Sequence, residues 1–237
     1  MSTDDTTAPT APVVLAHGAW ADGSSWSRVI GLLRDRGVRA RAAPLPLTSL
    51  DDDVAALDRL LDRVAEPALV VGHAYAGAVI GSARPDKVSG LLYVAALAPD
   101  EGETVADVFY RGEPHPDAPE LTPDAAGLVW LPDMAFADAF AQNATPEDHT
   151  WLASVQRPIA VGCITTPVGA PLWRTRPSWY FVAEQDRMIP PGTQRFMAER
   201  MHASIRSMNT DHAPLISAAG LVTDVIMDAL QQTALVH

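Results

Sequence analysis

Cysteine is almost absent from this chain of 237 residues, in which Cys163 is the single example. One cysteine cannot form an intramolecular disulfide or supply a metal site built from several thiolates. We interpret it as a buried structural thiol in preference to a catalytic one. The sequence also lacks a Gly-x-Gly-x-x-Gly motif after a predicted strand, a phosphate-binding loop and a His-Glu-x-x-His motif. We therefore expect no metal and no organic cofactor.

Positive charge is scarce as well, with 17 Lys and Arg residues against 29 Asp and Glu residues and a formal net charge of -12. Such a surface repels phosphate backbones and acidic lipid headgroups, which argues against nucleic acids and membranes as partners. No apolar run reaches the length that spans a bilayer without a break. Residues 1–12 are polar and acidic, unlike a signal peptide, so we expect a cytoplasmic protein with a loosely packed tail at residues 1–11. The oligomeric state has no signature in the sequence.

Short apolar runs alternate with amphipathic stretches through most of the chain. The apolar runs predict strands at residues 12–16, 38–42, 68–71, 91–95, 179–183 and 204–208. The amphipathic stretches predict helices capped by Ser24 or Ser25, after Ser49, at 192–201 and at 214–230. This alternation predicts a single α/β domain over residues 12–237, with a mostly parallel sheet and helices on both faces.

Two stretches need separate interpretation. Between about residues 99 and 175 the alternation stops, and we predict an insertion that packs over the sheet as a lid. Asp51, Asp52 and Asp53 fall in the first turn of the helix after Ser49, where carboxylates complement the helix dipole. We interpret these three residues as a solvated helix start in preference to a metal site.

The strand predicted at 68–71 runs directly into residues 72–77 (GHAYAG), which we call the elbow, and then into a helix. A sharp strand-to-helix turn of this kind needs small residues, and its usual pattern is Gly-x-Ser-x-Gly, with the serine as nucleophile. Ala76 keeps the small size that the second glycine provides. Ala74 stands at the serine position and has no atom that could attack a carbonyl. The chain therefore cannot hydrolyse esters through a serine acyl-enzyme at this position.

Other features accompany the elbow in the order that α/β-hydrolases have along the chain. Residues 17–20 (HGAW) follow the first strand, where the backbone N–H of Ala19 would form an oxyanion hole together with that of Tyr75. Asp186 follows the strand at 179–183, and His212 lies between the strand at 204–208 and the last helix. We assign His212 as the catalytic acid or base and Asp186 as the carboxylate that orients it.

Some residues near these motifs have weaker assignments. Glu184 and Asp211 are less favoured alternatives to Asp186. We expect His73 to pack beneath the elbow and His17 to brace the loop at 17–20 through hydrogen bonds. The residues predicted to contact substrate are Trp20, Ser25, Trp130, Phe136 and Trp151.

With these motifs in place, the chain resembles small bacterial α/β-hydrolases similar to the plant methylesterase and hydroxynitrile-lyase group. The resemblance extends from Pro12 to the C-terminus, although residues 99–175 match only in location and character. It implies the α/β-hydrolase fold. The predicted lid indicates a small, mostly apolar substrate that bears a carbonyl. The same group includes methylketone synthases, which lack the serine and decarboxylate 3-keto acids, so the resemblance implies that an altered elbow is compatible with catalysis.

Three functions are compatible with alanine at the elbow. The favoured one is an enzyme that uses His212 and Asp186 as acid and base together with the oxyanion hole, in lyase, decarboxylase or direct-water hydrolase chemistry. The second is a serine esterase inactivated by a Ser-to-Ala change at position 74. The third is a ligand-binding protein of the same fold without turnover, which the retained His212 and Asp186 disfavour.

Overall fold

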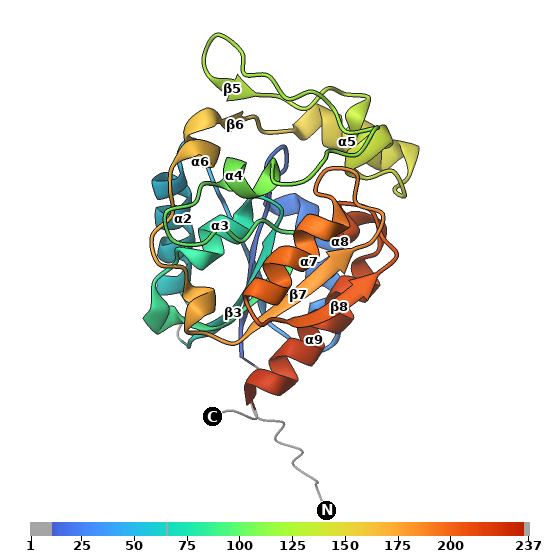
Figure 1. Cartoon of the computed structure of the whole chain (residues 1–237). Coiled ribbons are helices and arrows are strands. Elements are labelled where there is room, and N and C mark those ends of the chain that lie inside the picture. The colour runs from blue at the N-terminus through green and yellow to red at the C-terminus, as the bar shows by residue number, and fades with distance from the viewer. Residues whose placement is uncertain (1–10, 65, 235–237) are drawn as a thin grey trace, which may run out of the picture.

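The computed structural model describes residues 11–64 and 66–234, so the tail predicted at residues 1–11 lies almost entirely outside the described residues. The centre of the domain is a six-stranded sheet in which every pair of neighbouring strands is parallel. Figure 1 shows this sheet, whose order is β2-β1-β3-β4-β7-β8. The strands are β1 (Val13–Ala16), β2 (Ala40–Ala43), β3 (Ala68–His73), β4 (Val88–Val94), β7 (Ser178–Ala183) and β8 (Ser204–Met208). The predicted α/β fold class is confirmed.

The helices that cover the sheet lie between its strands in sequence, except α9, which follows the last strand. They are α1 (Ser27–Asp35), α2 (Leu50–Asp62), α3 (Ala76–Gly81), α7 (Pro191–Arg200) and α9 (Ala219–Ala234), with a short η2 (Pro85–Lys87) before β4. The step from β1 to β2 runs opposite to the step from β2 to β3, so right-handed crossovers place α1 and α2 on opposite faces. Helix α9 packs against α1, and α3 packs against α2. Among the described helices, none is both long and apolar enough to cross a bilayer.

Helix ends differ from the prediction in two places. The first helical segment is η1 (Gly23–Trp26), and its cap is Asp22, whose carboxylate accepts the Ser24 N–H at 2.8 Å. Ser24 and Ser25 therefore lie inside the first turn, because Asp22, which directly precedes Gly23, takes the capping role. The single helix predicted at 214–230 is divided into α8 (Pro214–Ser217) and α9, with a break at Ala218.

The predicted solvated start of α2 is wrong for one of its three carboxylates. Ser49 caps α2 by accepting the Asp52 N–H at 3.1 Å, and Asp51 and Asp52 are exposed. Asp53, in contrast, has 0% of its surface exposed and accepts the Leu47 N–H at 2.7 Å. The loop before the helix folds over this carboxylate, which therefore belongs to the interior.

Residues 95–177, which we call the covering segment, connect β4 to β7. Most of the segment lies over the carboxyl ends of the strands, and its last part, residues 166–177, returns to the opposite edge of the sheet, where β7 begins (Figure 1). This segment contains α4 (Val105–Phe109), β5 (Leu128–Val129), η3 (Phe136–Phe140), α5 (Pro146–Val155), β6 (Ile159–Ala160), α6 (Val161–Thr165) and η4 (Leu172–Arg174). Backbone hydrogen bonds join it to loops of the sheet, from the Trp20 N–H to Arg157 O at 3.1 Å and from the Ala160 N–H to Leu47 O at 3.0 Å. The covering segment thereby encloses the strand ends that carry the candidate site.

Candidate active site

The elbow is a strained turn between β3 and α3. Ala74 has a φ of 50°, in the left-handed region that costs a residue with a Cβ atom about 1–2 kcal/mol. Hydrogen bonds hold this conformation, with the Leu97 N–H donating to Ala74 O at 2.9 Å and the Ala74 N–H donating to Val94 O at 3.3 Å. The turn therefore keeps the geometry that presents a residue at the end of a strand, although that residue is alanine.

Glycines at both ends of the elbow permit the close backbone approach. A Cβ atom at Gly72 would lie 2.9 Å from Ala76 O, and one at Gly77 would lie 2.2 Å from Leu97 O. Both distances are shorter than the closest approach of two non-bonded atoms, so a side chain at either position would displace the turn. The requirement for small residues, predicted from the sequence, has its physical cause in these contacts.

The loop after β1 lies directly against the elbow. A Cβ atom at Gly18 would lie 2.9 Å from Ala74 Cβ, so glycine is what allows the loop to reach this position. Trp20 has a φ of 58° and is fixed by its indole N–H, which donates to Val129 O at 3.0 Å. Within the described residues, the backbone N–H groups of Ala19 and Tyr75 donate no hydrogen bond to the protein. These two donors are available to an oxygen atom bound between the loop and the elbow.

His212 and Asp186 form a buried pair, with 2.8 Å between His212 Nδ1 and Asp186 Oδ2. The carboxylate accepts three further hydrogen bonds, from the N–H groups of Met188 and Ile189 to Oδ1 and from Gln194 Nε2 to Oδ2, all at 2.7–2.8 Å. An acceptor at Nδ1 fixes the proton there, so Nε2 carries the lone pair. Asp186 thus fixes the orientation of the imidazole ring.

The two alternative carboxylates have other partners. Glu184 pairs with Arg195. Asp211 accepts hydrogen bonds from the Ser217 hydroxyl at 2.6 Å and from the Asn143 N–H at 2.8 Å. In the part of the chain that the structure describes, it makes no hydrogen bond to the imidazole of His212. Asp186 is therefore the carboxylate that orients His212.

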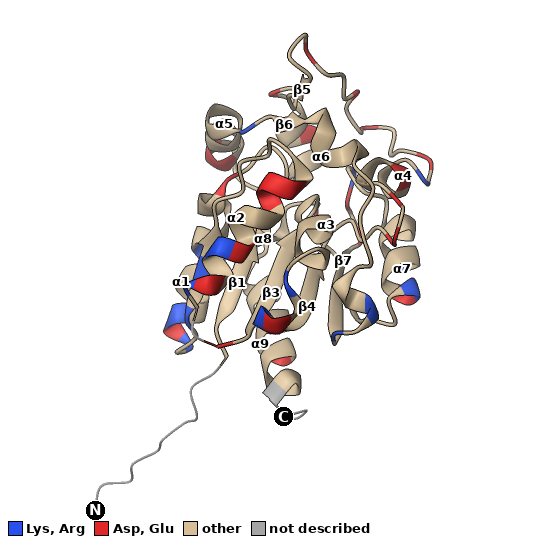
Figure 2. Ribbon diagram, turned by 90° about the vertical axis from the view of Figure 1, so that its left-hand side faces the viewer, with Lys and Arg blue, Asp and Glu red and all other residues tan. Residues whose placement is uncertain are grey.

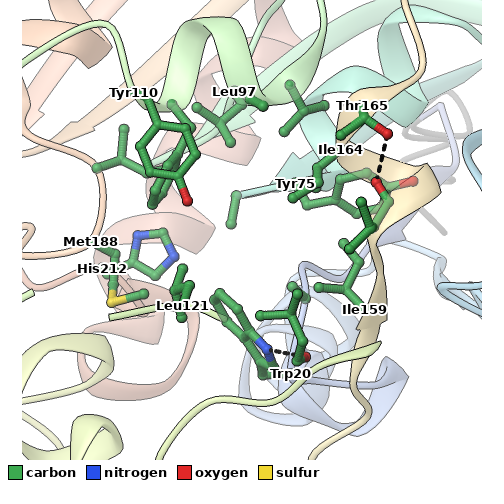
Figure 3. Close-up of a pocket in the computed structure, with 18 of the residues that line it drawn as sticks. Trp20, Tyr75, Leu97, Tyr110, Leu121, Ile159, Ile164, Thr165, Met188 and His212 are labelled. Atoms are coloured by element: carbon green, nitrogen blue, oxygen red, sulfur yellow. Dashed lines mark hydrogen bonds between the residues drawn. The ribbon is translucent and has the colours of Figure 1, made fainter. Parts of the chain in front are cut away.

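An apolar cavity of about 260 Å³ opens above these groups. Its walls include Ala19, Trp20, Ala74, Tyr75, Phe140 and His212. Figure 3 shows His212 at the edge of this space, which side chains of the covering segment complete on the other sides. A site with apolar walls and a few convergent polar groups is the usual form of a small-molecule binding site.

The sequence model of the alpha/beta hydrolase family matches residues 13–225. The chain belongs to the alpha/beta hydrolase family. It is similar to the pyrethroid hydrolase of Sphingobium wenxiniae, with 24% identity over 245 residues that cover 91% of this chain and 86% of the relative.

Solved structures show the same fold. A pyrethroid hydrolase has a TM-score of 0.80 at 22% identity, with 94% of this chain and 98% of that chain covered. A methylesterase from Arabidopsis has a TM-score of 0.76 at 18% identity, with 93% and 99% covered. The resemblance to plant methylesterases is therefore confirmed at the level of the fold.

In this α/β hydrolase, only Trp20 of the five predicted substrate contacts lines the cavity. Ser25 and Trp151 lie together at a separate depression, and the Ser25 hydroxyl is bound to Asp22 O at 2.7 Å. Trp130 is 48% exposed and donates from its indole to Asp124, whereas Phe136 is fully buried against Phe140. Phe140, which was not among the predicted contacts, lines the cavity, and the centroid of its ring lies 5.2 Å from that of His212.

Two further histidines, His73 and His17, are buried beside the site and contact its backbone. His73 Nε2 lies 2.7 Å from His212 O and donates to it, which fixes the backbone that carries the base. Burial and the nearby His212 hold the pKa of His73 well below its ordinary 6.5. His17 has a lowered pKa because of burial, and its Nδ1 lies 3.0 Å from Gly18 O. Both side chains have structural contacts of the kind predicted for them.

Protonation of His73 makes the stability of the fold depend on pH. The unfolded chain binds a proton at His73 below about pH 6.5, while the folded chain does not, so stability is lost as pH falls below that value. The expected loss is about 1.4 kcal/mol per pH unit. Urea unfolding between pH 6.5 and 5 should show a shallower pH dependence for His73→Gln, or for His73→Asn if the first variant does not fold. Burial raises the pKa of Asp53 and Asp211, so these two carboxyls make the fold more stable as pH falls. They do so equally in the parent and in the His73 variant. If the free energy of unfolding depended on pH identically in parent and variant, His73 would not be the group whose protonation destabilises the fold.

A buried polar cluster anchors Tyr75, the residue that follows Ala74. The Tyr75 hydroxyl donates to Asp53 at 2.7 Å, and Cys163 Sγ lies 3.7 Å from the same carboxylate oxygen. Burial raises the pKa of the Cys163 thiol to about 12, in agreement with a buried structural thiol. The sequence did not predict this cluster, because the three residues lie far apart in the chain and Asp53 has the pattern of an exposed helix start.

Removing the Tyr75 hydroxyl should destabilise the fold. In Tyr75→Phe the buried Asp53 loses a donor, which we expect to lower the free energy of unfolding by about 1–3 kcal/mol. Tyr110→Phe is the matched control, because Tyr110 is 64% exposed and a change there should stay within about 0.5 kcal/mol. Urea denaturation of both variants checks this, and equal stability would show that the bond to Asp53 contributes little.

Proposed function

We propose that this α/β hydrolase is an enzyme acting on an apolar carbonyl compound through His212 and Asp186, without a serine acyl-enzyme. The observation that carries the proposal is the buried 2.8 Å bond between His212 and Asp186 at the edge of a cavity that Ala74 also lines. A serine hydroxyl is absent at this wall, so the substrate or a water molecule would stand beside His212 directly.

The proposed chemistry begins with binding of a carbonyl oxygen at the free N–H groups of Ala19 and Tyr75. His212 Nε2 would remove a proton from an attacking water in an ester, or from the β-hydroxyl of a β-hydroxy ketone, whose Cα–Cβ bond then breaks to leave an enolate and an aldehyde or ketone. In a 3-keto acid, loss of CO2 leaves an enolate, and protonated His212 would return a proton to its carbon. The negative charge that develops on the oxygen would be stabilised by the two N–H groups, and the imidazolium by Asp186. A positioned base contributes about 10²–10⁴-fold, and each fixed donor of an oxyanion hole about 10²–10³-fold.

The apolar walls support this mechanism. Tyr75 turns its hydroxyl away toward Asp53, and Trp20 uses its indole N–H on Val129. Few polar side chains therefore compete with His212 for the substrate, and electrostatic interactions strengthen where water is excluded. The walls also favour a substrate whose surface is mostly apolar.

A serine esterase inactivated at position 74 is the second candidate. The φ of 50° at Ala74 favours this candidate. The left-handed conformation costs free energy, and that cost is useful where the turn presents a reactive side chain to a substrate, which alanine does not have. This candidate predicts no turnover by the chain with alanine in place.

The experiment that tests the proposal is turnover by the unaltered chain on activated esters, 3-keto acids and β-hydroxy ketones, with products identified by mass spectrometry. We expect conversion of at least one class, and loss of that conversion in Asp186→Asn, because an amide no longer enforces the required tautomer of His212. Ligands recovered unaltered in every class would overturn the proposal in favour of an inactivated esterase or a binding protein.

A further inference from the structure

A second cavity of about 560 Å³ adjoins the one at His212. The two cavities share four wall residues, Phe109, Tyr110, Leu121 and Met188. The residues common to both walls therefore lie between the two spaces. We call the space at His212 the inner cavity and the other the outer cavity.

Tyr110 stands at the boundary between the cavities. It is 64% exposed and packs edge-on against Phe109, with ring centroids 4.9 Å apart. Figure 3 shows its ring at the side of the inner cavity. An exposed side chain can change rotamer at low cost, so the Tyr110 ring can move aside for a ligand that extends from one cavity into the other.

The remaining wall of the outer cavity is the stretch from Gly112 to Thr122, which follows α4 and is rich in proline. A salt bridge of 3.0 Å joins Asp117 in this stretch to Arg187, which directly follows Asp186. Arg187 also donates to Asp138 O at 2.6 Å. This salt bridge joins the wall of the outer cavity to the loop that carries Asp186, and it thereby holds the outer cavity in place beside the inner one.

The size and charge of the two cavities indicate what they hold. At roughly 30 Å³ per small group, the inner cavity accommodates about nine non-hydrogen atoms, and the outer cavity accommodates more. Glu120 is the one charged residue among those that line the outer cavity, and Figure 2 shows further acidic positions along the loop after α4. This arrangement disfavours an anionic tail and suits a neutral apolar one.

We propose that the substrates of this α/β hydrolase are elongated neutral carbonyl compounds, with the carbonyl end in the inner cavity and an apolar tail that passes Tyr110 into the outer cavity. The inference rests on the proposed function for the position of the carbonyl. It differs from the expectation of a small substrate, because the inner cavity alone would hold only the reacting end.

The test is the affinity of 2-alkanones from 2-pentanone to 2-undecanone, measured by isothermal titration calorimetry with the unaltered chain. These ketones bind without needing turnover. The dissociation constant should fall about two- to fourfold for each added methylene, as expected for transfer from water to apolar surroundings. The fall should continue beyond 2-octanone, whose size matches the inner cavity, because longer tails enter the outer cavity.

A blocking variant locates the tail. Ala118 lines the outer cavity, so Ala118→Phe should leave the affinity for 2-pentanone unchanged and remove the gain beyond 2-octanone. Ala126→Phe is the matched control, because Ala126 is exposed on a turn outside both cavities. If Ala118→Phe does not fold, Ala118→Leu serves the same purpose.

The outcomes separate this inference from the proposed function. An affinity that levels off at 2-octanone would overturn the two-cavity inference and leave the carbonyl site intact. Continued gain in a protein that never converts a substrate would support the inference and contradict the catalytic proposal. Failure of every 2-alkanone to bind would overturn both.

Discussion

Ala74→Ser is expected to raise hydrolysis of 4-nitrophenyl butyrate by about 10³-fold or more over the unaltered chain. Removing the serine of a Ser-His-Asp triad lowers turnover by about 10⁶-fold. Introducing a serine into an otherwise complete site should therefore recover a large part of that factor. The Cβ atom already occupies the position, and Ala74 shares the cavity wall with His212. The substitution adds one oxygen atom to a wall that Ala74 and His212 share. Stopped-flow absorbance should show a burst of nitrophenol that matches the enzyme concentration.

The control for this prediction is the double variant Ala74→Ser with His212→Ala. It should lose the gain, because the serine would have no base to accept its proton. A folded Ala74→Ser protein with no gain would contradict the alignment of His212 and the two N–H groups around position 74. The gain by itself does not separate the two candidate functions, which differ in what the alanine protein does.

His212→Ala is expected to lower turnover of whichever carbonyl substrate the unaltered chain converts by about 10²–10⁴-fold. The reason is loss of the group that moves the proton, while the cavity and the N–H donors of Ala19 and Tyr75 remain. The measurement is kcat under saturating substrate, with thermal unfolding to verify the fold.

His202→Ala is the matched control, because His202 is exposed and is not among the residues that line the cavity. It should keep the full activity. If His212→Ala also keeps it, another group is the base and the proposed mechanism is wrong.

The sequence allowed much of the site's framework to be predicted. The elbow, the loop at residues 17–20 and His212 each follow a strand, and parallel strands bring their carboxyl ends to one edge of the sheet. Chain order was therefore enough to expect Asp186 beside His212, and the 2.8 Å bond agrees with it.

The walls of the cavity could not be predicted in the same way. Aromatic residues in the covering segment have no regular period, so the sequence does not distinguish Phe140 beside His212 from the exposed Trp130. Gln194 was missed for another reason. It lies within α7, where glutamine is ordinary, and its bond to Asp186 depends on how that helix packs against β7. Asp53 was misread because a helix start has the same sequence pattern whether it is exposed or buried.

The central claim is that His212 performs acid or base chemistry at a carbonyl with Ala74 in place. Its most direct test is entry of solvent label into 2-heptanone, followed by mass spectrometry in D₂O and in H₂¹⁸O. Deuterium would report proton removal beside the carbonyl, and ¹⁸O would report attack by water. The account predicts that the unaltered chain accelerates at least one exchange and that His212→Ala does not. Exchange at the same rate with both proteins, or at the rate of buffer alone, would contradict it.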